Sequence, residues 1–148
     1  MSSDYRESLR KFQRRISSVH YKSKMWNDEN LQMPEVLFNR KIINIACRSG
    51  YSPCLKDAYA AFSNWIQKDN NKLLSPNFRD YIVKYGVSYS KVQSDYDFVW
   101  NKYIDTPADD PIKEVLLMSF AYIKDSQIVK KYSFFNFLVQ NIFLILIF

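Results

Sequence analysis

Residues 52–66 read SPCLKDAYAAFSNWI, and their apolar side chains repeat with the period of an α-helix. A spacing of about 3.6 residues places these side chains on one side of a helix, as in a helix that buries one face. The segment starts with Ser52 and Pro53, which favours a serine N-cap followed by proline in the first turn. We therefore predict a helix packed against a core. Its apolar positions are Leu55, Ala58, Tyr59, Phe62, Trp65 and Ile66.

Similar apolar stripes lie on both sides of this segment, and no convincing strand pattern separates them. Ser75-Pro76 and Asp110-Pro111 repeat the start signal, while Gly50 and Gly86 follow apolar runs, where a left-handed helix terminus favours glycine. We therefore predict an all-α fold of consecutive antiparallel helix pairs, either a bundle or a right-handed solenoid of helical hairpins. Of the two we favour the solenoid, stacked as an irregular HEAT- or armadillo-like superhelix. The other stripes are Tyr5, Leu9, Phe12, Ile16 and Val19; Leu37, Phe38, Ile42, Ile45 and Ala46; Phe78, Ile82 and Tyr85; Tyr96, Val99, Trp100, Tyr103 and Ile104; and Ile112, Val115, Leu116, Phe120 and Ile123.

The composition excludes several classes of protein. Hydrophobic residues make up 47% of the 148 residues and aromatic residues 17%, which is enough apolar surface to exclude intrinsic disorder. Only two glycines are present, too few for a glycine-rich phosphate loop. His20 is the one histidine, so the chain alone cannot build a histidine-rich zinc site or a catalytic centre with several histidines.

The positive charge is concentrated at the amino terminus. Residues 1–24 contain seven basic and two acidic residues, whereas the remaining chain contains fourteen basic and thirteen acidic residues. A basic face formed by Arg6, Arg10, Arg14 and Arg15 suggests either an anionic partner, such as nucleic acid or a membrane surface, or the solvated side of an amphipathic helix. No nucleic-acid motif accompanies it, so we favour the solvated side and expect no nucleic-acid partner.

Cys47 and Cys54 flank a predicted turn between two helices. Such a turn brings two cysteines within disulfide range, whereas two buried free thiols are the alternative. A disulfide would indicate an oxidising compartment. The amino terminus is charged and has no apolar signal segment.

Several short motifs follow one another along residues 4–132. They are Ala46-Cys47-x-x-Gly50-x-x-x-Cys54, Ala61-Phe62-x-x-Trp65, Ser75-Pro76-Asn77-Phe78-Arg79, Tyr85-Gly86-Val87 and Tyr96-Asp97-Phe98-x-Trp100-x-x-Tyr103, with a late helix around 114–132. In order and spacing they resemble the carboxy-terminal helical domain of aminopeptidase N-like zinc aminopeptidases. We therefore divide the chain into residues 1–132, part of such a domain, and residues 133–148, a hydrophobic tail outside the family pattern.

The resemblance implies a lid. In that family the helical domain covers the catalytic domain, closes the peptide cavity and often supplies dimer contacts, on extracellular or plasma-membrane enzymes. The expected partners are therefore the catalytic domain of the parent enzyme, a second copy and peptide. Cys47 and Cys54 would match the family's first disulfide, and Lys84 and Tyr122 stand where many relatives carry a second bonded pair.

The catalytic residues of the resembled family are missing from this chain. It contains neither His-Glu-x-x-His nor Gly-Ala-Met-Glu-Asn, so we assign no catalytic residue and no metal ligand, and zinc is expected only in full-length relatives. Alone, the chain should not hydrolyse peptides.

Arg79 and Trp100 are candidates for contact with peptide, and burial in the core is the alternative for the aromatic residues around them, Trp65, Tyr85 and Tyr103.

The tail, residues 133–148, reads SFFNFLVQNIFLILIF. It is interrupted by polar residues and is too short to match a membrane span of about 20 apolar residues. A glycolipid-anchor signal, a core helix and an incorrect gene model are the remaining explanations. For the whole chain, the leading hypothesis is a non-catalytic helical part of an aminopeptidase, and the alternative is a helical interaction scaffold with a basic amino-terminal helix.

Overall fold

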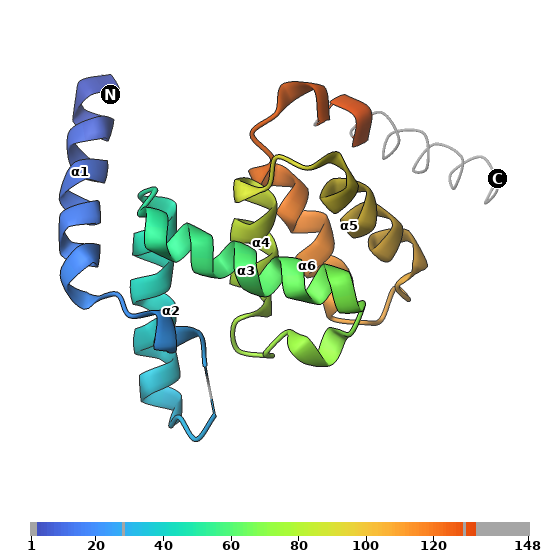
Figure 1. Ribbon diagram of the computed structural model, residues 1–148, viewed down its shortest axis with the longest axis horizontal. Helices are drawn as coiled ribbons and strands as arrows, with labels where there is room; N and C mark the ends of the chain where they lie inside the picture. Colours follow the sequence, from blue (N-terminus) through green and yellow to red (C-terminus); the bar gives the residue numbers. More distant parts are fainter. Residues whose placement is uncertain (1–2, 28, 129, 133–148) are drawn as a thin grey trace.

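The computed structural model describes residues 3–27, 29–128 and 130–132. These residues include six α-helices and three short 3-10 helices, with further helical residues at 126–128 and 130–132, and contain no strand, which confirms the all-α prediction (Figure 1). The stacking of the helices as a HEAT- or armadillo-like superhelix stays a prediction. The elements are α1 (Ser3–His20), η1 (Ser23–Trp26), α2 (Met33–Arg48), α3 (Ser52–Lys68), η2 (Asn71–Leu73), α4 (Arg79–Tyr89), α5 (Gln93–Asp105), α6 (Ile112–Ser119) and η3 (Phe120–Tyr122).

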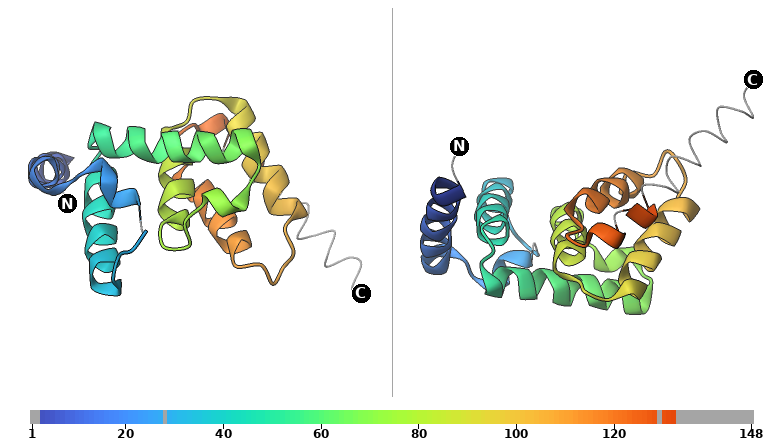
Figure 2. Two further views of the ribbon diagram at one scale, coloured as in Figure 1. Left: turned by 60° about the horizontal axis from the view of Figure 1, so that its bottom comes forward. Right: turned by 90° about the horizontal axis from the view of Figure 1, so that it is seen from above.

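The helix α3 connects the two ends of the molecule (Figure 1). Helices α1 and α2 lie side by side and antiparallel at one end, while α4, α5 and α6 lie at the other (Figures 1 and 2). From the end of α2, α3 runs across the molecule and packs most closely on α4, which in turn packs against α6. The extended core therefore lies along one face of α3.

The predicted stripe of α3 is confirmed as the centre of that core. Leu55, Ala58, Phe62 and Trp65 are buried, and Tyr59 and Ile66 are half-buried. The stripe predicted for residues 78–85 is buried as well, at Phe78, Ile82 and Tyr85.

Gly86 lies within α4 and does not terminate it, so the predicted helix end at this position is wrong. A Cβ atom on Gly86 would lie 2.3 Å from Cγ and 2.4 Å from Cβ of Phe62. The absence of a side chain therefore allows α3 and α4 to approach closely. By contrast, Gly50 has a φ of +84° directly after α2, as a left-handed terminus requires.

The three predicted start signals have different outcomes. Ser52 is the first residue of α3, so the N-cap position before it is occupied by Tyr51. No side-chain hydrogen bond caps this end of the helix. The hydroxyl of Ser75 accepts the N–H of Asn77 in a turn, and α4 begins only after it. The carboxylate of Asp110 accepts the N–H of Ile112 at 2.9 Å, as expected at the start of α6.

Candidate functional site

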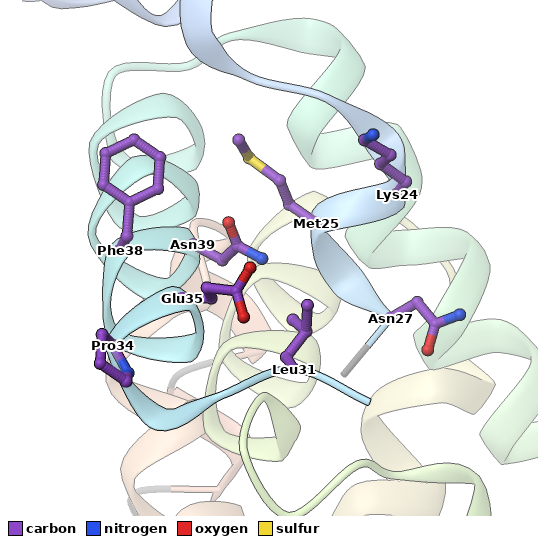
Figure 3. Close-up of a pocket in the computed structure, with 8 residues that line it drawn as sticks. All are labelled: Lys24, Met25, Asn27, Leu31, Pro34, Glu35, Phe38 and Asn39. Atoms are coloured by element: carbon purple, nitrogen blue, oxygen red, sulfur yellow. The ribbon is translucent and has the colours of Figure 1, made fainter. Parts of the chain in front are cut away.

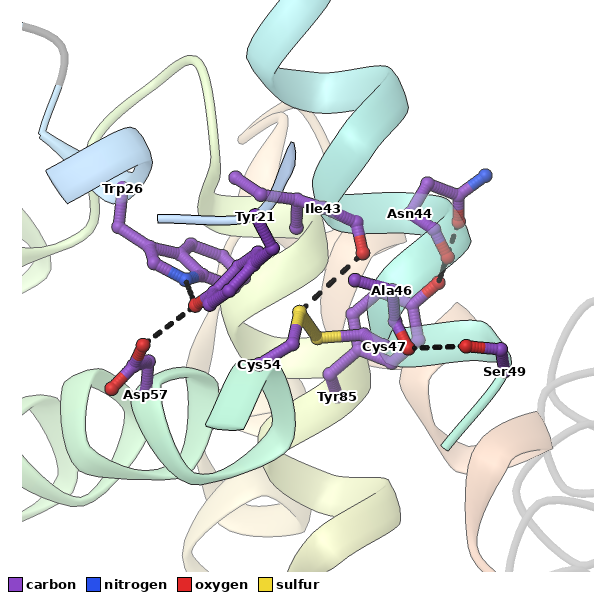
Figure 4. The surroundings of a disulfide bond; sticks show 10 residues. All are labelled: Tyr21, Trp26, Ile43, Asn44, Ala46, Cys47, Ser49, Cys54, Asp57 and Tyr85. Carbon is purple, nitrogen blue, oxygen red and sulfur yellow. Dashed lines mark hydrogen bonds between the residues drawn. A yellow bond between two sulfur atoms is a disulfide. The ribbon is translucent and has the colours of Figure 1, made fainter. Parts of the chain in front are cut away.

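The disulfide between Cys47 and Cys54 confirms the predicted pairing (Figure 4). The two sulfur atoms lie 2.12 Å apart and the Cα atoms 5.2 Å apart, and both residues are buried. The bond joins the end of α2 to the first turn of α3. It therefore fixes the turn between α2 and α3.

A partly buried hydrogen-bond network lies beside the disulfide, and the sequence did not predict it. The Tyr21 hydroxyl donates to the Asp57 carboxylate at 2.6 Å and accepts the indole N–H of Trp26 at 2.7 Å (Figure 4). Burial and the hydrogen bond to the carboxylate raise the pKa of Tyr21 well above its ordinary value. The three residues come from different segments, so no local spacing signals the network. Because its partners are satisfied by one another, we assign it to structure.

The predicted basic face is divided by the packing of α1. Arg6, Arg10 and Arg15 are exposed. Arg14 is half-buried and lies on the side of α1 that packs against α2, where its guanidinium donates to the Ser49 carbonyl at 2.7 Å. The expectation that all four arginines share a solvated face is therefore wrong for Arg14.

Arg14 also donates to the carboxylate of Glu7 at 2.7 Å, and this hydrogen bond lowers the pKa of Glu7. One of the two acidic side chains of α1 is thus already paired within the helix.

The apolar stripe of α1 faces solvent. We use "α1 stripe" for its five residues, which are 38–65% exposed. They are Tyr5, Leu9, Phe12, Ile16 and Val19. Helix α1 instead packs against α2 through Gln13, Arg14 and Ser17, which are half-buried or buried. The expectation that the stripe would pack within this chain is therefore wrong.

Helix α2 is apolar on two sides. Its buried residues are Val36, Ile43, Ala46 and Cys47, so of the predicted stripe only Ala46 is fully buried. We use "α2 outer face" for four other apolar residues that are 39–63% exposed. They are Met33, Leu37, Phe38 and Ile45. A helix with apolar residues on both sides is typical of the interior of a larger assembly.

A cavity of about 480 Å³ lies beside this face, between η1 and the start of α2 (Figure 3). Its lining includes Met25, Leu31 and Phe38, together with the carboxylate of Glu35. Glu35 accepts the N–H of Gln32 at 2.9 Å and so caps α2. The lining therefore carries packing and capping side chains and no arrangement suited to acid–base chemistry.

Trp100 packs in an aromatic cluster at the other end of the molecule. Its ring centroid lies 5.7 Å from that of Phe120 and 5.4 Å from that of Tyr132. The hydroxyl of Tyr132 donates to Asp97 at 2.7 Å, and Lys131 lies 2.8 Å from the same oxygen. These hydrogen bonds, with that of Lys131 contributing most, lower the pKa of Asp97.

Arg79 is the half-buried first residue of α4 and is far in sequence from Trp100 on α5. Neither residue lines the cavities of about 480, 800 and 250 Å³ found in the described part of the chain. Trp65 and Tyr85 are buried, and Tyr103 is half-buried. Contact of Arg79 and Trp100 with peptide stays a prediction.

Lys84 and Tyr122 lie next to each other, on α4 and η3. The Lys84 ammonium is 4.3 Å from the centre of the Tyr122 ring and 4.9 Å from that of Tyr85. A cation–π contact therefore joins the two elements at these positions.

The described residues contain no group of three or more His, Cys, Asp or Glu side chains that could hold a metal ion. His20, at the end of α1, is exposed. The described His, Cys, Asp and Glu side chains therefore do not fit zinc, which takes four protein ligands in structural sites and three in catalytic sites. Among residues 3–27, 29–128 and 130–132, no helix has the length and apolar character needed to cross a membrane.

Comparison with known proteins identifies the family. A sequence model of the ERAP1-like C-terminal domain matches residues 1–144. The chain belongs to this family. Glutamyl aminopeptidases from Sus scrofa and Bos taurus are each 25% identical to this ERAP1-like C-terminal domain over 107 residues. Those residues make up 72% of the chain but 11% of either relative, so the chain matches a small part of their length. No solved structure matches it.

The family confirms the predicted resemblance to the helical domain of an aminopeptidase. The tail, residues 133–148, lies outside the described residues.

Proposed function

We propose that this chain is a non-catalytic helical part of a zinc aminopeptidase, which as a whole enzyme releases amino-terminal residues from peptides. The family match over residues 1–144 carries the proposal. In the whole enzyme, according to this proposal, the chain packs against the catalytic domain and forms one wall of the peptide cavity. Zinc and the catalytic residues belong to the catalytic domain.

The α2 outer face supports a packing role. Its side chains are apolar and solvent-exposed, yet the same helix has other residues that are buried, and it packs against α1, α3 and η1. Covering such a face stabilises by about 25 cal/mol per Å² of apolar area removed from water. We therefore assign the α2 outer face to contact with the remainder of the aminopeptidase.

The disulfide supports a location outside the cytosol. Disulfides persist in oxidising compartments and are rare in the cytosol. We accordingly propose that the enzyme acts in the extracellular space or at the plasma-membrane surface. Peptide contact through Arg79 and Trp100, and dimerisation, are secondary parts of the same proposal.

The transcript that encodes this chain provides the first test. We expect an upstream sequence in the same reading frame that encodes His-Glu-x-x-His. A complete transcript without such a sequence would contradict the proposal and favour the alternative, a helical interaction scaffold. The exposed Arg6, Arg10 and Arg15 are the observation that supports this alternative.

A co-purification experiment provides the second test. The upstream catalytic part is co-expressed with the full chain or with the variant Leu37→Glu/Phe38→Glu. We expect the wild type to co-purify with the catalytic part and the variant to be lost, because charged side chains cannot be buried without a partner. The variant Lys56→Glu, a charge change at an exposed position of the neighbouring helix α3, is the control and should co-purify. Hydrolysis of an aminoacyl-nitroanilide by the complex, but not by the chain alone, completes the test.

A further inference from the structure

The α1 stripe has a spacing that specifies a particular kind of partner. Tyr5, Leu9, Phe12, Ile16 and Val19 are separated by alternating intervals of four and three residues. This is the spacing of a narrow coiled-coil seam, whereas a helix that lies in a membrane surface has a wider apolar face.

The stripe is accessible along its length. All five side chains are exposed, and α1 reaches beyond the end of α2 at its amino-terminal end (Figure 1). The contact with α2 uses the side of α1 formed by Gln13, Arg14 and Ser17, and of these only Gln13 borders the stripe. A second helix can therefore lie along the stripe from its other border, that of the exposed Ser8 and Arg15, without displacing α2.

Positive charge flanks the stripe. Arg6 directly follows Tyr5, and Arg15 directly precedes Ile16; both arginines are exposed. In a coiled-coil seam these flanking positions face the flanking positions of the partner helix and determine its charge. Arg10 and Lys11 add positive charge on the outer sides.

A second copy of this chain is a poor partner for the stripe. Its flanking positions carry Arg6, Ser8, Gln13, Arg15 and His20. None of these is acidic, so self-association would bring two positively charged helices together without a complementary ion pair.

We infer that the α1 stripe binds one amphipathic helix whose own apolar residues follow the same alternating spacing and whose flanking positions carry Asp or Glu. This helix belongs to the remainder of the aminopeptidase, so the inference rests on the proposed function. It assigns α1 to helix-to-helix recognition, with charge selecting the partner and the apolar stripe contributing most of the affinity.

Binding of two designed peptides to the full chain tests the inference. Each peptide carries leucine at the alternating positions; the first has glutamate and the second has lysine at the flanking positions. Fluorescence anisotropy should show the glutamate peptide binding at least about tenfold more tightly at low salt. At about 1 M salt, where the screening length is short, the preference should shrink.

Two variants make the test specific. Arg6→Glu/Arg15→Glu should reverse the preference, so that the lysine peptide binds more tightly. Leu9→Asn/Phe12→Asn should abolish binding of both peptides. All four side chains are exposed, so both variants should retain the helical circular dichroism and the Cys47–Cys54 disulfide.

Equal binding of both peptides, or binding of neither, overturns the inference. Binding to phosphatidylserine vesicles without binding of the glutamate peptide would also overturn it, in favour of a membrane surface. Dimerisation of the chain that Leu9→Asn/Phe12→Asn abolishes would overturn it in favour of a second copy. The transcript test and the Leu37→Glu/Phe38→Glu co-purification use neither the peptides nor α1, so they show separately whether the proposed function fails.

Discussion

The replacement Gly86→Ala should destabilise the fold, although alanine is the better helix former. Gly86 lies within α4 opposite Phe62 of α3, and an added Cβ would lie 2.3, 2.4 and 2.8 Å from Cγ, Cβ and Cδ2 of Phe62. Phe62 has no exposed surface and packs between Tyr59 and Trp65, with ring centroids 6.2 and 5.8 Å away. The Phe62 ring cannot turn away, so the two helices must separate.

The magnitude follows from two opposing effects. Overpacking a filled core costs about 1–3 kcal/mol, and a separation of two helices belongs at the upper end of this range. Gly to Ala within a helix returns about 1 kcal/mol. We therefore expect the free energy of unfolding to fall by about 2 kcal/mol.

Urea denaturation with the disulfide intact measures this change. Ser88→Ala, at a half-buried position of the same helix, is the control and should change stability by less than about 0.5 kcal/mol. Because the Cβ of Phe62 itself lies 2.4 Å away, Gly86→Ala should remain destabilising in a Phe62→Ala background. A Gly86→Ala variant that is more stable than the wild type would refute the close approach of α3 and α4.

Three further changes should also be measurable. Replacing Cys47 and Cys54 by alanine should lower the free energy of unfolding by about 2 kcal/mol, the loop-closure value for so short a loop; an unchanged urea midpoint would contradict the structural role of the disulfide. The pKa of Asp97 is lowered in the folded state, so the ionised carboxylate stabilises the folded protein. This stabilisation is complete above the ordinary carboxyl pKa of about 4 and is lost as pH falls through the pKa that Asp97 has in the folded protein. Asp97→Asn should therefore lose less stability on acidification than the wild type, as measured by thermal unfolding across pH. Lys84 and Tyr122 stand where many members of the resembled family carry a second bonded pair, and their elements α4 and η3 pack together, so Lys84→Cys/Tyr122→Cys should form a second disulfide under oxidising conditions; two free thiols in folded protein would contradict this.

The helices could be predicted from local pattern, but their ends only in part: Gly50 and Asp110 mark helix ends as expected, whereas Gly86 lies within α4. The stripe of α3 was predicted correctly, because its apolar side is covered by elements within this chain. The same reasoning failed for α1 and α2: periodicity identifies an apolar side but does not show what covers it. In α2, Leu37 and Phe38 repeat as regularly as the buried residues, yet they are exposed.

The tight turn between two helices allowed the pairing of Cys47 with Cys54 but left two free thiols as the alternative, and the family resemblance favoured the disulfide. The network of Tyr21, Trp26 and Asp57 could not be predicted, because it forms only when separate segments meet.

The amino-acid sequence by itself determined the helical class and the family resemblance, because both depend on spacing along the chain, and through the resemblance it favoured the disulfide. Only the tertiary structure decided the role of Gly86, the side of α1 that holds Arg14, and the exposure of the α1 stripe. These features depend on which faces meet when helices distant in sequence pack together. Packing leaves solvent-exposed any apolar face without a neighbour, and in this chain those faces are the candidate binding surfaces.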